Sequence, residues 1–194
     1  MPNFQKLHWP DNSIYFLTGS TFLHYPYFKE EKQKQIVLNQ IKKVKDNLNI
    51  PISVYSIAVN HYHLKFYLKN GLHLAKIKQI MHGGTSFAYH EKYKKRYKEI
   101  WQSDYTIIIT SKEMDAKITG YIGGNLLKHR EVGTFQELED NPFSSYWYLI
   151  KKYGNKLAQE LIRSVIDVGE DKKGRINEKE LGKLKLHKPS AKAG

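Results

Sequence analysis

Two histidines separated by a single residue are the side chains of this sequence best suited to chemistry. His61 and His63 lie inside an apolar stretch that continues through Phe66 and Leu68. Aromatic and β-branched residues of this kind favour a β-strand, in which every second side chain points to the same face of the sheet. The two imidazole rings are then neighbours and can together bind one divalent cation. The spacing therefore predicts half of a metal site, carried by a strand.

A tyrosine and an asparagine further along the chain supply a candidate nucleophile and a third ligand. Ser111 is a suitable N-cap for a helix that continues through Tyr121 and Asn125. Because these two residues lie one helical turn apart, their side chains project from the same face. An amide oxygen is a reasonable ligand for a hard cation such as Mg²⁺ or Mn²⁺. If this helix packs beside the histidine strand, a phenol and a metal ion lie together.

The hydrophobic pattern predicts an α+β fold in which strands and helices alternate. Strands are expected at 13–22, 52–68 and 101–110, helices at 29–48, 72–98 and 111–128, and a partly helical segment at 143–166. This order is typical of a ferredoxin-like or RRM-like antiparallel or mixed sheet with helices on one face. We expect the other face to be open. On the second strand Tyr62 faces the helices, whereas His61 and His63 face the open side.

Composition excludes several classes of protein. The chain has 194 residues and no cysteine, which rules out disulfide bonds, thiolate metal sites and a cysteine nucleophile. No apolar run is long enough to span a membrane, and the N-terminus lacks the apolar segment of a signal peptide. We therefore expect a cytoplasmic protein without a membrane partner.

The charge balance favours a polyanionic partner. Lys plus Arg number 32 against 19 Asp plus Glu, which gives a formal net charge of +13, and nucleic acid is the leading partner for such a chain. The cations Lys65, Lys128, His129 and Arg130 flank the candidate site in sequence and are candidate DNA-phosphate contacts. A solvated basic face explains the same four residues equally well.

Four short motifs, taken together and in order, resemble those of the single-tyrosine HUH transposases. His61-Tyr62-His63 is similar to the His-hydrophobic-His motif, and the segment from Tyr121 to Asn125 resembles the Tyr-Ile-x-x-Asn or Gln element of these insertion-sequence transposases. Two further stretches look like those of the branch known as REP-associated tyrosine transposases. These are Trp101-Gln102-Ser103-Asp104-Tyr105 and Ser144-Ser145-Tyr146. The resemblance covers about residues 12 to 150.

The resemblance implies an HUH endonuclease fold and a specific chemistry. Residues 1–167 are expected to form the transposase domain and residues 168–194 a basic, polar, weakly packed tail. The family implies His61, His63 and Asn125 as ligands of Mg²⁺ or Mn²⁺ and Tyr121 as the catalytic nucleophile. It implies cleavage and rejoining of single-stranded DNA beside hairpins through a 5′-phosphotyrosine intermediate. Both a monomer and a homodimer are compatible with it.

The sequence also departs from the family pattern, and other functions stay open. Asn125 is followed by Leu126 where the family often has proline, and Gly123 and Gly124 each cost the helix about 1 kcal/mol relative to alanine. The glycines indicate either a mobile nucleophile helix or a degenerate one. One alternative is a non-catalytic single-stranded nucleic-acid-binding protein on the same fold. Another is a relaxase or replication initiator, which typically has a third histidine where this chain has Lys65.

Overall fold

The core of the protein is a four-stranded antiparallel sheet with the strand order β2-β3-β1-β4. The computed structural model describes residues 9–94, 99–171 and 175–184. The strands are β1 (Ser13–Thr21), β2 (Ile52–Ile57), β3 (His61–Leu68) and β4 (Trp101–Ile109). Buried side chains line both faces of the two central strands, so the sheet is the middle layer of the molecule.

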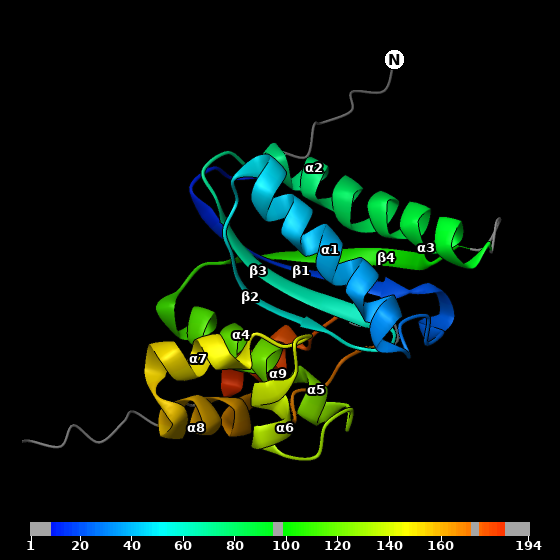
Figure 1. Ribbon diagram of the computed structural model, residues 1–194. Helices are drawn as coiled ribbons and strands as arrows, with labels where there is room; N and C mark the ends of the chain where they lie inside the picture. The colour runs from blue at the N-terminus through cyan, green and yellow to red at the C-terminus, as the bar shows by residue number, and fades with distance from the viewer. Residues whose placement is uncertain (1–8, 95–98, 172–174, 185–194) are drawn as a thin grey trace, which may run out of the picture.

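One face of the sheet is covered by α1 (Glu31–Leu48) and by a long helical segment between β3 and β4. That segment consists of α2 (His73–Lys78), the π-helical turn η2 (Gln79–Gly84) and α3 (Thr85–Tyr93). The resulting order, strand-helix-strand-strand-helix-strand, together with the strand order of the sheet, is the ferredoxin-like plan. The predicted fold class is therefore confirmed (Figure 1).

The single long strand predicted over residues 52–68 is wrong. The chain turns back after Ile57, where the amide of Ala58 donates a hydrogen bond to the carbonyl oxygen of His61 at 2.8 Å. β2 and β3 then pair antiparallel as a hairpin. The apolar residues Ala58 and Val59 continue the hydrophobic run through the turn, which is why the sequence pattern conceals it.

The prediction of an open second face is also wrong. Below the sheet in Figure 1 lies a layer of helices that begins with α4 (Lys112–Gly123), and the predicted N-cap Ser111 accepts a hydrogen bond from the amide of Met114. Strand parity is nevertheless as expected, because Tyr62 points toward α1–α3 and His63 toward α4. The other members of this layer are α5 (Asn125–Lys128), α6 (Phe135–Asp140), α7 (Tyr146–Tyr153), α8 (Asn155–Val165) and α9 (Glu178–Lys183).

The segment after residue 167 packs more firmly than its polar composition suggests. Val168, Ile176 and Leu181 are all buried, and Asn177 caps α9 by accepting a hydrogen bond from the amide of Glu180. The expectation of weak packing therefore fails for the described part of this segment, while residues 172–174 and 185–194 lie outside the described residues. The domain boundary at residue 167 remains a prediction. Within the described ranges, no helix combines the length and apolar character needed to cross a membrane.

The glycines of α4 have a packing explanation. An alanine Cβ at Gly120 would lie 2.8 Å from the backbone oxygen of Leu161, and one at Gly123 would meet the side chain of Leu149. Glycine at these positions lets α4 approach α7 and α8 closely, because a methyl group has no room there. The closely packed layer holds the helix that carries Tyr121.

Replacing Gly120 with alanine is expected to destabilise the fold despite the better helix propensity of alanine. The clash is with backbone of α8, so we expect a loss of about 1–3 kcal/mol in the free energy of unfolding. Gly83→Ala is the matched control, because a Cβ there meets nothing within 4 Å. It should leave stability unchanged or raise it by up to about 1 kcal/mol. Urea unfolding of both variants measures the difference, and equal stabilities would contradict the packing explanation.

A buried histidine behind β3 makes the stability of the fold depend on pH. His82 lies 2.8 Å from the hydroxyl of Tyr62 and stacks on Trp101. Burial lowers the pKa of His82 to about 4 from its ordinary 6.5, and the charge of Lys78 lowers it further while Asp104 opposes the shift. The unfolded chain therefore binds a proton between these values that the folded chain does not bind. Stability is lost as the pH falls through this range.

We expect His82 to contribute up to about 3 kcal/mol of this loss between pH 6.5 and pH 4. In His82→Gln the free energy of unfolding should decline less steeply over that range than in the wild type. His73→Gln, at an exposed position on α2, should keep the wild-type slope. Identical slopes for wild type and His82→Gln, measured by urea unfolding at several pH values, would refute the assignment.

Candidate metal and nucleophile site

The two histidines of β3 lie side by side beneath α4. His61 pairs with Ser20 and His63 with Thr18 across the β1–β3 ladder, and the two ring centroids are 4.8 Å apart. Both side chains are buried, and burial lowers the pKa of His61 to about 4 and that of His63 well below 6.5. Both imidazoles are therefore neutral at neutral pH, which is the form that binds metal ions.

A second polar group orients each imidazole. The Nδ1 of His61 lies 2.7 Å from Oδ1 of Asn60, and the amide nitrogen of Asn60 donates to the carbonyl oxygen of His24. The Nδ1 of His63 lies 2.7 Å from the hydroxyl of Thr18. If both Nδ1 atoms carry the proton, each Nε2 presents a lone pair, which is how outer hydrogen bonds prepare histidine ligands. Asn60 and Thr18 are functional candidates that the sequence analysis missed.

Asn125 faces the same point in space as the histidines. Its Oδ1 lies 3.1 Å from Nε2 of His61, although both atoms carry lone pairs in the orientation described above. The Nε2 of His63 is buried without a hydrogen-bond partner among the described residues. Two acceptors in contact and a third without a donor are the arrangement expected of ligands that share a cation. Two imidazole nitrogens and an amide oxygen thus fit a divalent metal ion.

Tyr121 completes the group predicted from the sequence. Its ring centroid lies 5.3 Å from that of His63, and its side chain is almost fully buried. The hydroxyl donates a hydrogen bond to Glu170 and lies 3.5 Å from Nζ of Lys128. Burial, together with the negative charge and hydrogen bonding of Glu170, raises the pKa of Tyr121 well above 10. The phenol is therefore neutral in the free protein and must lose its proton in order to act as a nucleophile.

Glu170 is a third residue of this site that the sequence did not indicate. Its carboxylate accepts hydrogen bonds from Tyr121 and from Lys128, the latter at 2.8 Å, and lies 3.5 Å from Nε2 of His129. Burial opposes its ionisation, but the hydrogen bond from His129 and the nearby histidines and Lys128 outweigh burial and lower the pKa of Glu170. No motif marks this glutamate, which lies in a segment that the composition assigns to a tail.

The four predicted DNA-contacting cations lie in three different environments. Lys65 is buried, 2.7 Å from Asp115 and bonded to Thr119, so its ammonium group is not presented to a phosphate. Lys128 and His129 both contact Glu170 inside the site. Only Arg130 of the four is exposed without being part of this cluster.

The two remaining motifs support the site from a distance. Trp101 packs against Tyr62 and His82 on the opposite side of the sheet from the histidines. The hydroxyl of Ser145 bonds both the amide and the carbonyl of Tyr55, which fastens the start of α7 to β2. Both motifs are therefore structural in this chain.

Loss of the Thr18 hydroxyl is expected to weaken metal binding without unfolding the protein. Thr18→Val keeps the buried volume but leaves Nδ1 of His63 without its partner, so we expect a 10- to 100-fold loss in Mn²⁺ affinity, about the range for such outer partners. Thr85→Val is the matched control, because Thr85 is equally buried and its hydroxyl has no partner among the described residues. Calorimetric titration measures both, and equal affinities would argue against orientation by Thr18.

Comparisons with known proteins identify the family and the fold of the chain. The sequence model of the family described as "Transposase IS200 like" matches residues 17–125, a range that includes both histidines, Tyr121 and Asn125. A solved REP-associated tyrosine transposase, bound in its crystal to a REP hairpin, shares the fold with a TM-score of 0.56 at 19% identity, over 88% of this chain and 93% of the other. A putative transposase from Deinococcus radiodurans R1 is 14% identical over 56% of this chain and 87% of its own, with a TM-score of 0.42. No curated protein matches the sequence significantly.

Proposed function

Because this chain belongs to the IS200-like family of single-tyrosine HUH transposases, we propose that it cleaves and rejoins single-stranded DNA in a metal-dependent reaction at hairpin-associated sites. The observation that carries the proposal is the convergence of His61, His63 and Asn125 with Tyr121 in one buried site. These residues come from three separate elements, β3, α4 and α5, and the candidate ligands of β3 lie beside the nucleophile only in the folded chain.

In the proposed reaction Nε2 of His61, Nε2 of His63 and Oδ1 of Asn125 would hold Mg²⁺ or Mn²⁺. Bound there, such an ion would supply Lewis-acid stabilisation of the charge on the scissile phosphate. Asn60 and Thr18 keep the two imidazoles in place for this task. The three ligands carry no charge, so the phosphate of the substrate would supply the negative charge beside a bound ion.

Tyr121 is the proposed nucleophile. Its hydroxyl oxygen attacks phosphorus as the phenolic proton leaves, and the bond from phosphorus to the 3′ oxygen of the leaving strand breaks. A 5′-phosphotyrosine results, together with a free 3′-OH once the leaving oxygen takes up a proton. The carboxylate of Glu170 holds the phenol through a hydrogen bond, and Lys128 lies close enough to stabilise the developing phenolate. Attack of a 3′-OH on the phosphotyrosine reverses the step, so bond energy is conserved and no nucleotide triphosphate is needed.

The proposed substrate is single-stranded DNA that carries a hairpin. Support comes from the hairpin-bound relative of the same fold and from the net charge of +13. Tyr121 lies beside His63 of its own chain, which favours a site that works within one protomer, while a homodimer remains a prediction. A non-catalytic binder on an open sheet face is disfavoured because helices cover that face. A relaxase-like third histidine is replaced by Lys65, which pairs internally with Asp115.

The test is the formation of a covalent protein–DNA adduct. The protein is incubated with Mg²⁺ or Mn²⁺ and labelled oligonucleotides with a hairpin, next to oligonucleotides of the same composition without one. Adducts on denaturing gels that require both the metal and the hairpin are the expected result. Tight binding of many sequences without any adduct would instead identify a nucleic-acid-binding protein.

A further inference from the structure

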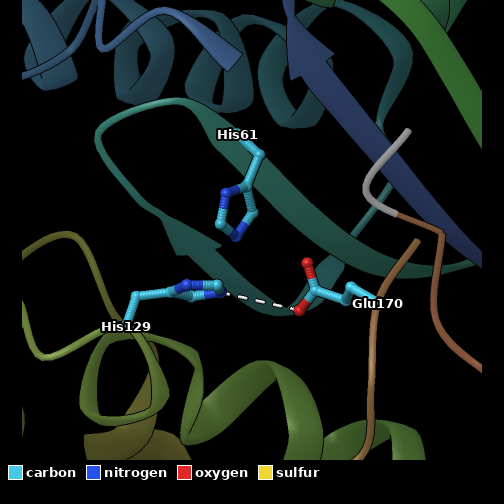
Figure 2. Close-up of side chains that lie close together, drawn as sticks. All are labelled: His61, His129 and Glu170. Carbon is cyan, nitrogen blue, oxygen red and sulfur yellow. Dashed lines mark ion pairs between the residues drawn. The ribbon is translucent and has the colours of Figure 1, made fainter. Parts of the chain in front are cut away.

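His129 and Glu170 lie beside His61, and the proposed reaction gives this group of three side chains no role as metal ligands. One potential ligand atom from each of the three residues lies within 4.8 Å of those of the other two. Figure 2 shows the three side chains converging on one space from β3, from the end of α5 and from the C-terminal segment. The rings of His61 and His129 meet edge to face at a centroid distance of 4.7 Å.

One oxygen of the Glu170 carboxylate is engaged, and the other has no hydrogen-bond or ion-pair partner among the described residues. Tyr121, Lys128 and His129 all contact Oε1. In Figure 2 the second oxygen lies on the side of His61, away from the contact with His129. The ammonium group of Lys128 hydrogen-bonds to Oε1. Oε2 therefore remains available to a cation on the other side of the carboxylate.

We propose that His61, His129 and Glu170 form a second ligand set, specific for a divalent transition ion such as Zn²⁺, which shares His61 with the set of His61, His63 and Asn125. The inference rests on the proposed function only in that His61 belongs to both sets. Two imidazoles and one carboxylate suit Zn²⁺ and related ions, whereas Mg²⁺ prefers oxygen ligands and several waters.

Sharing His61 makes the two sets mutually exclusive. The Nε2 of His61 has a single lone pair and can bind one ion at a time. A Zn²⁺ ion held by His129 and Glu170 therefore displaces Mn²⁺ from the set that includes His63. It also fastens the C-terminal segment to β3, since Glu170 lies in that segment and His61 begins β3.

Metal binding, measured without DNA, tests the inference. Bound Mn²⁺ is followed by electron paramagnetic resonance while Zn²⁺ is added to the Tyr121→Phe protein, which removes catalysis from the experiment. We expect His129→Gln and Glu170→Gln each to bind Zn²⁺ at least about tenfold more weakly and to need correspondingly more Zn²⁺ to release Mn²⁺. Both variants should bind Mn²⁺ itself as the unsubstituted protein does. His73→Gln and Glu160→Gln, at exposed positions outside the site, serve as matched controls.

The outcomes separate this inference from the proposed function. If His129→Gln and Glu170→Gln release Mn²⁺ at the same Zn²⁺ concentration as the controls, the second ligand set is wrong, because Zn²⁺ then simply replaces Mn²⁺ among the first ligands. If His63→Gln binds Mn²⁺ as the controls do, the first set is wrong and the proposed function loses its metal site. Circular dichroism and thermal unfolding of each variant verify that the fold is intact. Glutamine at position 170 retains an acceptor for the ammonium group of Lys128, so a folded protein is expected.

Discussion

Tyr121→Phe is expected to abolish the covalent DNA adduct and to reduce strand cleavage by at least about a thousand-fold. The substitution removes only the hydroxyl that donates to Glu170, and the ring that packs against His63 and Phe16 remains. Hairpin affinity and thermal stability should therefore change little. Adduct formation on denaturing gels and a binding titration with the same labelled hairpin measure the two effects separately.

Tyr62→Phe is the matched control for this prediction. Tyr62 is as buried as Tyr121 and lies between the two histidines, but its hydroxyl bonds His82 on the opposite side of the sheet. It should keep the adduct even if its stability falls through the lost hydrogen bond. An adduct that persists in Tyr121→Phe and disappears in Tyr62→Phe would show that the nucleophile is Tyr62, on the opposite face of β3, and would contradict the assignment to Tyr121.

His63→Gln is expected to reduce the rate of DNA cleavage by at least about a hundred-fold and to lose most of the affinity for Mn²⁺. His63 is fully buried and its Nε2 has no hydrogen-bond partner among the described residues, which leaves this atom available to the proposed metal ion. Glutamine is chosen because it keeps most of the volume between Phe16 and Tyr121. Removing metal from the wild type with a chelator should have the same effect on cleavage.

Hairpin binding distinguishes a role of the metal in chemistry from one in affinity. If the ion serves chemistry, His63→Gln and the chelated wild type should bind the hairpin within about threefold of the untreated protein, since phosphate contacts to cationic side chains supply most of the affinity. His82→Gln, at a buried histidine on the other side of the sheet, should retain both metal binding and cleavage. Cleavage that survives both His63→Gln and chelation would show that the reaction does not depend on a metal ion.

Periodicity made the central half of the site predictable. The two-residue period of a strand places His61 and His63 together, and the period of a helix does the same for Tyr121 and Asn125. The relation between the histidines holds in the folded chain, and Oδ1 of Asn125 reaches Nε2 of His61. The single helix predicted over residues 111–128 is wrong, because α4 ends at Gly123 and α5 begins at Asn125. The contact between strand and helix could not be derived from either period, and the resemblance to a family supplied it.

Features that depend on long-range packing were beyond the sequence pattern. The turn between β2 and β3 contains the apolar residues Ala58 and Val59, so hydrophobicity alone extends the strand through it. Lys65 is a candidate DNA contact in the sequence, but in the folded protein it forms a salt bridge with Asp115, which lies in another element. Glu170 enters the site because buried residues such as Val168 and Ile176 anchor the segment on either side of it. A polar composition does not reveal such anchors when they are few.

Mapping the covalent adduct is the most direct test of the account. The protein is incubated with the hairpin oligonucleotide and Mg²⁺ or Mn²⁺, digested with nuclease and protease, and the modified peptide is identified by mass spectrometry. The account predicts a nucleotide joined through its 5′-phosphate to Tyr121, formed in wild type and absent after metal is removed. A modification on any other tyrosine, or no modification under conditions in which the DNA is cleaved, would contradict it.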